Sequence, residues 1–460
     1  MIKKLFPFKL QLQIFQLDEY SSSKFMSWII KHFFTRTIEN KKNLVWTQKA
    51  KSIYYLSQLL TIVFVLLSIY FFKLAGFVAS LIISTQSYIF ILIAYYLLLP
   101  YEIYQKNHIK QKSETKILSL KKVKVIGITG SYGKTSVKEF LYQLLKTEFK
   151  VLKTPESYNT PYGIAKVIDL ELDSSYDYFI CEMGAYRIGE IKEICDMVHP
   201  VYGILTGINE QHIESFGSLE NTTKGKFELI DALPENGFGV INIDNPHIKN
   251  NYAKYNKRLI PYGFSDDKYS IKNIITHSNG SEFTLILNGK KYKTHTKLIG
   301  IPNLQNILAA ATMCYLLQIP PHAIVTAINT ITPVPHRLEI KKTEHMTLID
   351  DSYNSNVNGF TEAIALLNSF KGHKILVTPG IVDLGNKTLP IHNELGKLLN
   401  PIDFVILVGN SERTQGLKNG INDKNKIIEI NSIKEMWNKI SELPVTNPVV
   451  LIENDLPDNY

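Results

Sequence analysis

Two long stretches without a charged residue constrain the fold of this chain most strongly. Residues 53–72 contain no Asp, Glu, Lys or Arg, and a second uncharged stretch, residues 74–101, follows Lys73. A helix needs about 20 apolar residues to cross the hydrocarbon core of a bilayer. The stretches therefore predict two transmembrane helices, at about residues 53–72 and 78–99. A buried helical hairpin in a soluble protein is the alternative, although soluble cores rarely contain such long uncharged stretches.

Lysines flank these stretches and predict their orientation. Four lie between Lys41 and Lys51 and seven between Lys106 and Lys124, whereas only Lys73 separates the two stretches. Cytoplasmic flanks of membrane proteins are enriched in Lys and Arg. We therefore expect a multi-pass protein of the cytoplasmic membrane, with both flanks and the domains that follow in the cytoplasm. In this prediction residues 1–52 are a basic region on the membrane surface, and residues 102–120 are a basic linker.

Composition narrows the choice of partners. The net charge is +9, and much of the excess lies near the uncharged stretches, which favours membrane lipid as a partner. No Arg-rich run or basic patch interleaved with aromatic residues occurs, so we expect no nucleic acid partner. The three cysteines, Cys181, Cys195 and Cys314, have neither zinc-type nor disulfide-type spacing. This indicates a reducing compartment and no structural metal cluster.

After residue 120 the pattern changes to short apolar runs that alternate with helical stretches. "VKVIGIT", "YDYFICEMG", "VYGILTGIN" and "GVINID" form one set, and "LIDDSYN", "KILVTPG", "FVILVGN" and "PVVLIEND" form another. Strands that alternate with helices indicate a mostly parallel sheet. The sequence therefore predicts two α/β domains, residues 121–332 and 333–460, joined by "ITPVPHRLE". An Asn288-Gly289 turn predicts a β-hairpin in the first domain.

The loop "GITGSYGKTS", residues 127–136, lies between a predicted strand and a predicted helix. Ile128 stands where the strict phosphate-loop pattern requires glycine, so only T-G-x-x-G-K-T remains. Glycines let the backbone approach phosphates, and loop amides with a helix N-terminus bind anions. We expect Lys134 to reach the β- and γ-phosphates of ATP and Thr135 to bind Mg²⁺; a plain strand-to-helix connection is the alternative. The predicted nucleotide-binding residues here are Gly130, Ser131, Tyr132, Gly133, Lys134, Thr135 and Ser136.

Further motifs follow this loop in a fixed order. They are "TPESYNTPYGIA", "EMGAYRIGEI", "INEQHIESFGS", "PNLQNILAAA", "PHRLE" and "DDSYNSN". Together with the loop they resemble the Mur ligase family, from about Lys121 to near the C-terminus. The resemblance implies an α/β fold with a central ATP-binding domain and a Rossmann-like C-terminal domain behind the membrane hairpin.

The resemblance also implies a reaction. ATP activates a peptide carboxylate as an acyl phosphate, and an amine then attacks it to form an amide bond; the protein positions the reactants and neutralises phosphate charge. The carboxylate would belong to a cell-wall muramyl peptide, soluble or lipid-linked. The amine would belong to an amino acid or to a dipeptide such as D-alanyl-D-alanine. Peptidoglycan synthesis with ATP and Mg²⁺ is the expected function.

Three further residues are assigned to the reacting phosphate by this resemblance. Glu182 ends a buried strand and would be a metal ligand beside Thr135; capping of the next helix is the alternative. His212 resembles a metal-binding histidine, whereas a lone histidine is more often structural. Lys226 stands where family members carry a lysine that can become carbamylated. Lys224 is a nearby competitor for this role, and a solvated surface lysine is the plain alternative.

The resemblance places the nucleotide between the two domains. Asn303 and Asn306 lie one helical turn apart and would reach the adenine, although Asn303 also fits a helix N-cap. Arg337 in the linker would reach the ATP phosphates when the domains close, with an interdomain salt bridge as the alternative. Further contacts follow from the same resemblance. Asp351, Tyr353 and Asn354 would bind nucleotide or form an Asx turn, and Asn159 and Thr160 would face the substrate.

The chain departs from the family pattern at both ends. Family members begin with a soluble domain that holds the UDP part of the substrate, whereas the predicted hairpin and its basic flanks stand there. This favours a substrate that already lies in the membrane. "LIENDLPDNY" replaces a Lys-Gly-Ser type turn, so residues for the amine substrate cannot be transferred from it. The rival functions are a related ligase or amidating synthetase for another peptide or lipid-linked substrate, and a P-loop membrane ATPase.

Overall fold

The computed structural model describes residues 7–18, 20–31, 44–156, 158–210, 213–277, 279–353, 355–382 and 384–454. The chain divides into two compact units, one covering the chain up to His108 and one running from Ile109 to Asp455.

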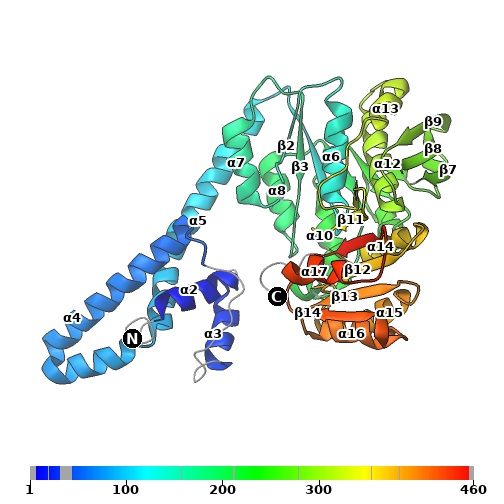
Figure 1. Ribbon diagram of the computed structural model, residues 1–460. Coiled ribbons are helices and arrows are strands. Elements are labelled where there is room, and N and C mark those ends of the chain that lie inside the picture. The colour runs from blue at the N-terminus through cyan, green and yellow to red at the C-terminus, as the bar shows by residue number, and fades with distance from the viewer. Residues whose placement is uncertain are drawn as a thin grey trace. The chain divides into compact units, whose positions relative to one another are not determined.

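Helices build the first unit (Figure 1). They are α2 (Phe8–Leu17), α3 (Ser22–Lys31), α4 (Gln48–Ser84) and most of α5 (Ser87–Ser119). Lys73 interrupts α4 with a non-helical backbone (φ 47°, ψ −130°), where the first predicted span ends. The second predicted span, residues 78–99, differs from the structure, because α4 ends at Ser84 and α5 begins at Ser87. Four consecutive polar residues, Ser84 to Ser87, occupy this turn, and absence of charge alone did not reveal it.

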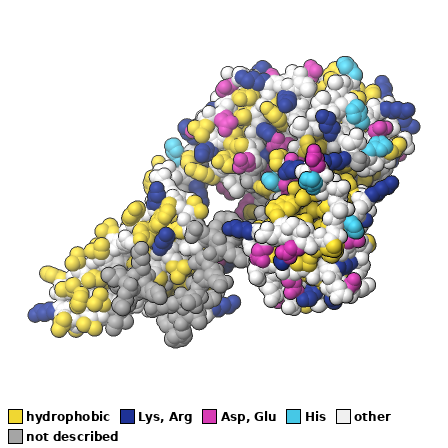
Figure 2. All heavy atoms as spheres, in the orientation of Figure 1, with side chains coloured by type: hydrophobic (Ala, Val, Ile, Leu, Met, Phe, Trp, Pro, Cys, Tyr) yellow, Lys and Arg dark blue, Asp and Glu magenta, His cyan; other side chains and the backbone are white. Residues whose placement is uncertain are grey.

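Helices α4 and α5 expose much of their apolar surface. Both are long and apolar enough to cross a membrane, and only 6% of the most apolar part of α4 is buried. Figure 2 shows hydrophobic side chains gathered on the outer surface of this unit. The small core of the unit joins all four helices: Phe15 of α2 contacts Phe25 and Tyr95, and Phe64 contacts Phe90. Helices α2 and α3 therefore bury one face against the hairpin.

The first α/β domain of the second unit contains a six-stranded parallel sheet in the order β2-β3-β1-β4-β5-β6. Its strands are β1 (Lys124–Thr129), β2 (Val151–Lys153), β3 (Tyr178–Glu182), β4 (Tyr202–Leu205), β5 (Phe238–Asn242) and β6 (Leu259–Tyr262). Its main helices are α6 (Lys134–Leu145), α7 (Pro161–Glu171), α8 (Glu190–Val198), α10 (Leu219–Asp231), α12 (Ile301–Leu316) and α13 (Pro321–Ile328). Helices α6, α12 and α13 cover one face and α7, α8 and α10 the other.

A small antiparallel sheet is inserted before α12. It consists of β7 (Tyr269–His277), β8 (Gly280–Leu287) and β9 (Lys290–Thr296). The turn between β8 and β9 is Asn288-Gly289, with φ of 50° and 79°. The predicted hairpin is therefore confirmed.

The second α/β domain has the strand order β10-β11-β15-β12-β13-β14, with only β10 antiparallel. Its strands are β10 (Glu339–Lys342), β11 (Thr347–Asp351), β12 (Lys374–Thr378), β13 (Phe404–Val408), β14 (Ile427–Ile430) and β15 (Val449–Glu453). Its helices include α14 (Val357–Ser369), α15 (Thr388–Leu398), α16 (Glu412–Gly420) and α17 (Met436–Ser441). Two α/β sheets, and with them two α/β domains, are thus confirmed, whereas the boundary between residues 332 and 333 stays a prediction.

The predicted basic linker, residues 102–120, is helical. Helix α5 continues to Ser119, and its last turns belong to the second unit. Lys110 pairs with Glu193 and Lys112 with Asp169, each at 2.7 Å. These lysines therefore bind the surface of the α/β domain. Composition alone had suggested that these lysines face membrane lipid, but their charges are paired with carboxylates of the same protein.

Candidate active site

The phosphate loop lies where β1 ends and α6 begins. Gly130 (φ 153°) and Gly133 (φ 79°) adopt backbone conformations that favour glycine. A Cβ atom at Gly133 would lie 2.8 Å from Oδ1 of Asn306, so the loop approaches α12 closely. Ile128 is fully buried within β1, which explains why the strict pattern lacks its first glycine. The strand simply continues to Thr129 before the loop turns.

Lys134 is the first residue of α6 and folds back over the loop. Its Nζ donates to the carbonyl oxygens of Gly130 (2.8 Å) and Ser131 (3.3 Å). The side chain is half-buried, and desolvation lowers its pKa to about 8 despite the opposing charge of Glu182. A phosphate bound here would favour the charged lysine, because an anion stabilises a neighbouring cation.

Several of the predicted loop residues contact other parts of the first domain. The Ser131 N–H donates to the Gly207 carbonyl at 2.7 Å. The Tyr132 ring packs against Gly207, and its hydroxyl accepts a hydrogen bond from Asn245 (3.2 Å). Ser136 is buried in the first turn of α6. Ser131 and Tyr132 thus hold the loop against neighbouring segments, and the nucleotide contacts predicted for Ser131, Tyr132 and Ser136 stay predictions.

Glu182 and Thr135, the two predicted metal ligands that the structure describes, meet beside the loop. Glu182 ends β3 next to Ile128 of β1, and only 2% of its surface is exposed. Its Oε1 accepts hydrogen bonds from the Thr135 hydroxyl (3.1 Å) and from Nδ2 of Asn159 (3.3 Å). Among the described residues the Glu182 side chain caps no helix, and the next helix, α8, begins after Gly189, so the capping alternative is wrong.

Lys138 is a site residue that sequence reasoning missed. Its fully buried side chain extends from the second turn of α6 and places Nζ 3.2 Å from Oε2 of Glu182. Nζ also donates to the Glu156 carbonyl. The spacing carried a signal, because residues four apart on a helix share a face, and Lys138 follows Lys134 by four.

The oxygen ligands near the loop fit Mg²⁺. The Oε2 atom of Glu182 accepts no well-aligned hydrogen bond among the described residues, although Lys138 lies beside it as an ion pair. Mg²⁺ commonly takes one or two protein oxygens and completes its shell with phosphates and water. Glu182 and Thr135 supply such a pair. Within the described ranges no group of three His, Cys, Asp or Glu side chains forms a metal cage, and His212 lies outside those ranges.

Lys226 lies inside the first domain on α10 and is 2% exposed. Its Nζ donates to the Ala185 carbonyl (3.2 Å) and lies 5.4 Å from the centre of the Phe216 ring. Burial, together with the charge of Lys134, lowers its pKa well below the ordinary value. Lys224, the competing residue, instead pairs with Glu220 on the surface. The alternative of a solvated surface lysine is therefore wrong for Lys226.

The two asparagines of α12 differ in their surroundings. Asn303 is not an N-cap, because α12 begins at Ile301 after Gly300. Its buried Nδ2 donates to the Ile299 carbonyl (2.9 Å), which closes the first turn of the helix. Asn306 lies against Gly133 of the phosphate loop. Asn306 thus lies at the loop, whereas the amide of Asn303 is engaged by its own helix.

Arg337 reaches the phosphate loop from the linker. Its Nη2 donates to the Thr135 hydroxyl at 3.3 Å, and its guanidinium group lies 4.3 Å from the centre of the Tyr353 ring. Asp351 accepts the Leu338 N–H (3.1 Å), and burial raises the pKa of Asp351 to about 6. The structure therefore gathers Arg337, Tyr353 and Asp351 at one place. Asn354 lies outside the described residues.

Asn159 and Thr160, the two residues predicted to face the substrate, have different roles in the structure. Asn159 enters the site through its hydrogen bond to Glu182, and its carbonyl accepts the Gly184 N–H (2.8 Å). Thr160 is the N-cap of α7, where its hydroxyl accepts the Gly163 N–H. Of the pair, only Asn159 contacts a described site residue.

Known proteins share both α/β domains. Residues 128–314 match the Mur ligase middle domain, and residues 336–453 match the Mur ligase glutamate ligase domain. The UDP-N-acetylmuramoyl-tripeptide--D-alanyl-D-alanine ligase of Escherichia coli K12 is 32% identical over 65% of this chain and 68% of its own length. The ligase of the same name from Buchnera aphidicola (Acyrthosiphon pisum) is 32% identical over 66% and 69%.

A solved structure shares the fold. The MurF ligase from Thermotoga maritima, in complex with ADP, has a TM-score of 0.69 and 24% identity over 76% of this chain and 80% of its own. The phosphate loop, the acid beside it and the linker arginine lie within the shared domains. This chain belongs to the Mur ligase family and is an ATP-dependent acid–amino-acid ligase.

Proposed function

We propose that the chain adds D-alanyl-D-alanine to a muramyl tripeptide of the cell wall. The observation that carries the proposal is the meeting of Thr135, Glu182 and Arg337 at the start of α6. A hydroxyl, a carboxylate and a guanidinium from three separate segments meet where the γ-phosphate of ATP would lie. The names of the relatives supply the two substrates.

In the first step the peptide carboxylate attacks the γ-phosphorus of ATP. A C–O–P linkage forms and ADP leaves. Lys134 and the loop amides stabilise the phosphates, and Arg337 stabilises the charge that moves to the leaving oxygen. Thr135 and Glu182 would hold Mg²⁺, which would supply further positive charge to the phosphate oxygens.

In the second step the neutral amine of the dipeptide attacks the acyl carbon. The amide bond forms, inorganic phosphate leaves with one oxygen of the former carboxylate, and the amine gives up a proton. Positioning dominates both steps, because a misaligned acyl phosphate would be lost to water.

Lys226 is proposed as the carbamylated lysine. Its lowered pKa increases the fraction of neutral amine, the form that reacts with carbon dioxide. The neutral amine would add carbon dioxide and lose a proton, which would place an anionic carbamate near Lys134. Carbon-13 bicarbonate should therefore label the wild type and Lys224→Ala but not Lys226→Ala; equal labelling of all three proteins would remove the assignment.

We further propose that α4 and α5 anchor the enzyme in the cytoplasmic membrane, with the catalytic unit in the cytoplasm. The support is the exposed apolar surface of these helices and their uncharged sequence. An anchored enzyme suits a lipid-linked muramyl peptide as well as a UDP-linked one. The lipid-linked substrate is therefore the second candidate.

A substrate comparison in detergent tests the function. Purified full-length protein is given ATP, D-alanyl-D-alanine and either the UDP-linked or the lipid-linked tripeptide, and products are identified by mass spectrometry. We expect ligation that requires both substrates, no product from Lys134→Ala, and normal product from Lys146→Ala at the exposed end of the same helix. ATP hydrolysis that ignores both substrates would instead identify an ATPase.

A further inference from the structure

The segment that presents Arg337 has an unusual backbone. His336 has φ of 61° and Leu338 has φ of 48°, so both neighbours of Arg337 adopt left-handed conformations. Residues with a Cβ atom rarely do so, and such conformations persist only where the surroundings hold them. Neither position is a glycine, which would adopt positive φ without steric strain.

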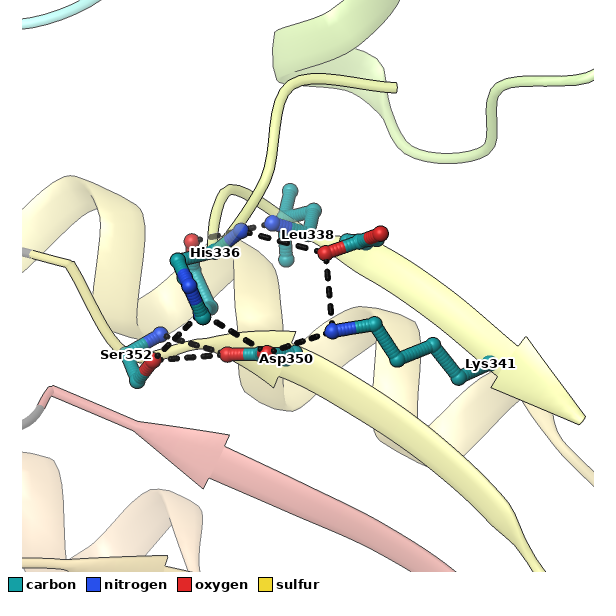
Figure 3. Close-up of polar contacts among 7 residues, drawn as sticks. His336, Leu338, Lys341, Asp350 and Ser352 are labelled. Carbon is teal, nitrogen blue, oxygen red and sulfur yellow. Dashed lines mark hydrogen bonds and ion pairs between the residues drawn. The ribbon is translucent and has the colours of Figure 1, made fainter. Parts of the chain in front are cut away.

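A carboxylate from β11 holds the first of these residues (Figure 3). The Nδ1 atom of His336 lies 2.9 Å from Oδ2 of Asp350. Asp350 is 6% exposed and also accepts hydrogen bonds from Lys341 (3.0 Å) and from the Ser352 hydroxyl (2.7 Å). Burial alone would raise the pKa of Asp350, but these hydrogen bonds and the nearby charges keep it below the ordinary value. The group at the centre of this cluster is therefore an anion.

Backbone hydrogen bonds fix the same turn on both sides. The His336 N–H donates to Glu339 (3.3 Å), and the His336 carbonyl accepts the Tyr353 N–H (3.3 Å). On the other side of Arg337, the Leu338 N–H donates to Asp351 (3.1 Å). The turn is thus tied to β10 through Glu339 and to the end of β11 through Asp350, Asp351 and the nearby Tyr353. The Arg337 side chain extends from this turn to Thr135.

We propose that His336 and Asp350 are positioning residues that hold the 336–338 turn so that Arg337 meets the phosphate loop. The proposal rests on the role given to Arg337 above. Neither residue contacts the phosphate loop itself. If the His336–Asp350 hydrogen bond is removed, we expect the 336–338 turn to relax toward negative φ. The Arg337 guanidinium group would then move away from Thr135. A catalytic group displaced by about 1 Å can lose about a hundredfold in rate.

The first test separates rate from nucleotide binding. In His336→Ala we expect the maximal rate of phosphate release to fall about 10- to 100-fold. Affinity for ADP should change less than about threefold, because the first domain holds most of the phosphate contacts. His336→Asn should recover part of the rate, because asparagine accepts positive φ more readily than alanine. The matched control is His345→Ala, which changes an exposed histidine in the connection between β10 and β11 and should behave as wild type.

A double-mutant cycle decides the mechanism. If His336 acts only through Arg337, the double variant His336→Ala/Arg337→Ala should be no slower than Arg337→Ala alone. Multiplying losses would overturn the positioning role, as would an unchanged rate in both His336→Ala and Asp350→Asn. If thermal unfolding shows that His336→Ala is poorly folded, Asp350→Asn removes the same hydrogen bond and the rate of phosphate release is measured in that variant instead. An Arg337→Ala protein with normal turnover would instead refute the role proposed for Arg337.

Discussion

Three lysines lie around the candidate site, with Lys134 half-buried and Lys138 and Lys226 buried, and each was predicted or missed for a different reason. Lys134 was predicted from a local motif and Lys226 from a family resemblance. Lys138 was missed, because its role depends on Glu182, which lies 44 positions later on a neighbouring strand. A sequence pattern shows which residues share a helix face. It does not show which strand end that face will meet.

Lys138 should stabilise the domain through Glu182. Lys138→Met removes the cation but leaves the carboxylate buried, and breaking a buried ion pair costs about 3–5 kcal/mol of the free energy of unfolding. The matched control is Lys153→Met, a partly exposed lysine that pairs with Glu139, where a loss below about 1 kcal/mol is expected. Thermal and denaturant unfolding of the full chain in detergent measure both. Equal stability of the two variants would show that the Lys138–Glu182 pair contributes little.

At the scale of elements, the four central strands of each six-stranded sheet could be predicted from their apolar runs. The short edge strands β2, β6, β10 and β14 were missed, because an edge strand buries less apolar surface and leaves a weaker pattern. Two further features could not be predicted. The turn at Thr85 and Gln86 lies inside an uncharged stretch, where hydropathy is high on both sides. The basic segment after residue 102 looked like a linker, because its partners, such as Asp169 and Glu193, are distant in sequence.

The carboxyl edge of the second sheet contains a buried acid that should make the protein sensitive to pH. Glu453, the last residue of β15, accepts hydrogen bonds from Ser355 and Thr378 and is fully buried. Burial raises its pKa from 4.5 to about 8. Between these values the folded chain holds a proton that the unfolded chain has lost, so stability falls as pH rises toward 8 and then levels off.

Glu453→Gln should remove this dependence. The amide does not titrate, so the melting temperature of the variant should rise relative to wild type between pH 5 and pH 9. The matched control is Glu429→Gln, an exposed acid on β14 of the same sheet, whose difference from wild type should stay constant. The measurement is thermal unfolding at three pH values. A constant difference for Glu453→Gln would mean that Glu453 is already ionised in the folded protein.

At the scale of the whole molecule, the hairpin predicts a definite topology. Residues 48–72 of α4 rise about 37 Å at about 1.5 Å per residue, which is enough to cross a bilayer. Reporter fusions after residue 40 and after residue 120 should both report the cytoplasm. A fusion after Lys73 should report the opposite side and serves as the control. A fusion after residue 120 that reports the outside would separate the catalytic unit from cellular ATP and defeat the proposed anchoring.

The central claim is that this chain forms an amide bond through an acyl phosphate. One oxygen atom tests it most directly. A muramyl tripeptide, UDP-linked or lipid-linked, is labelled with oxygen-18 in its terminal carboxylate and incubated with ATP, D-alanyl-D-alanine and the full-length protein. The account predicts that each phosphate released carries one labelled oxygen, in step with product, and that Lys134→Ala releases none. Unlabelled phosphate in the presence of both substrates would contradict it, because the carboxylate would then never have been phosphorylated.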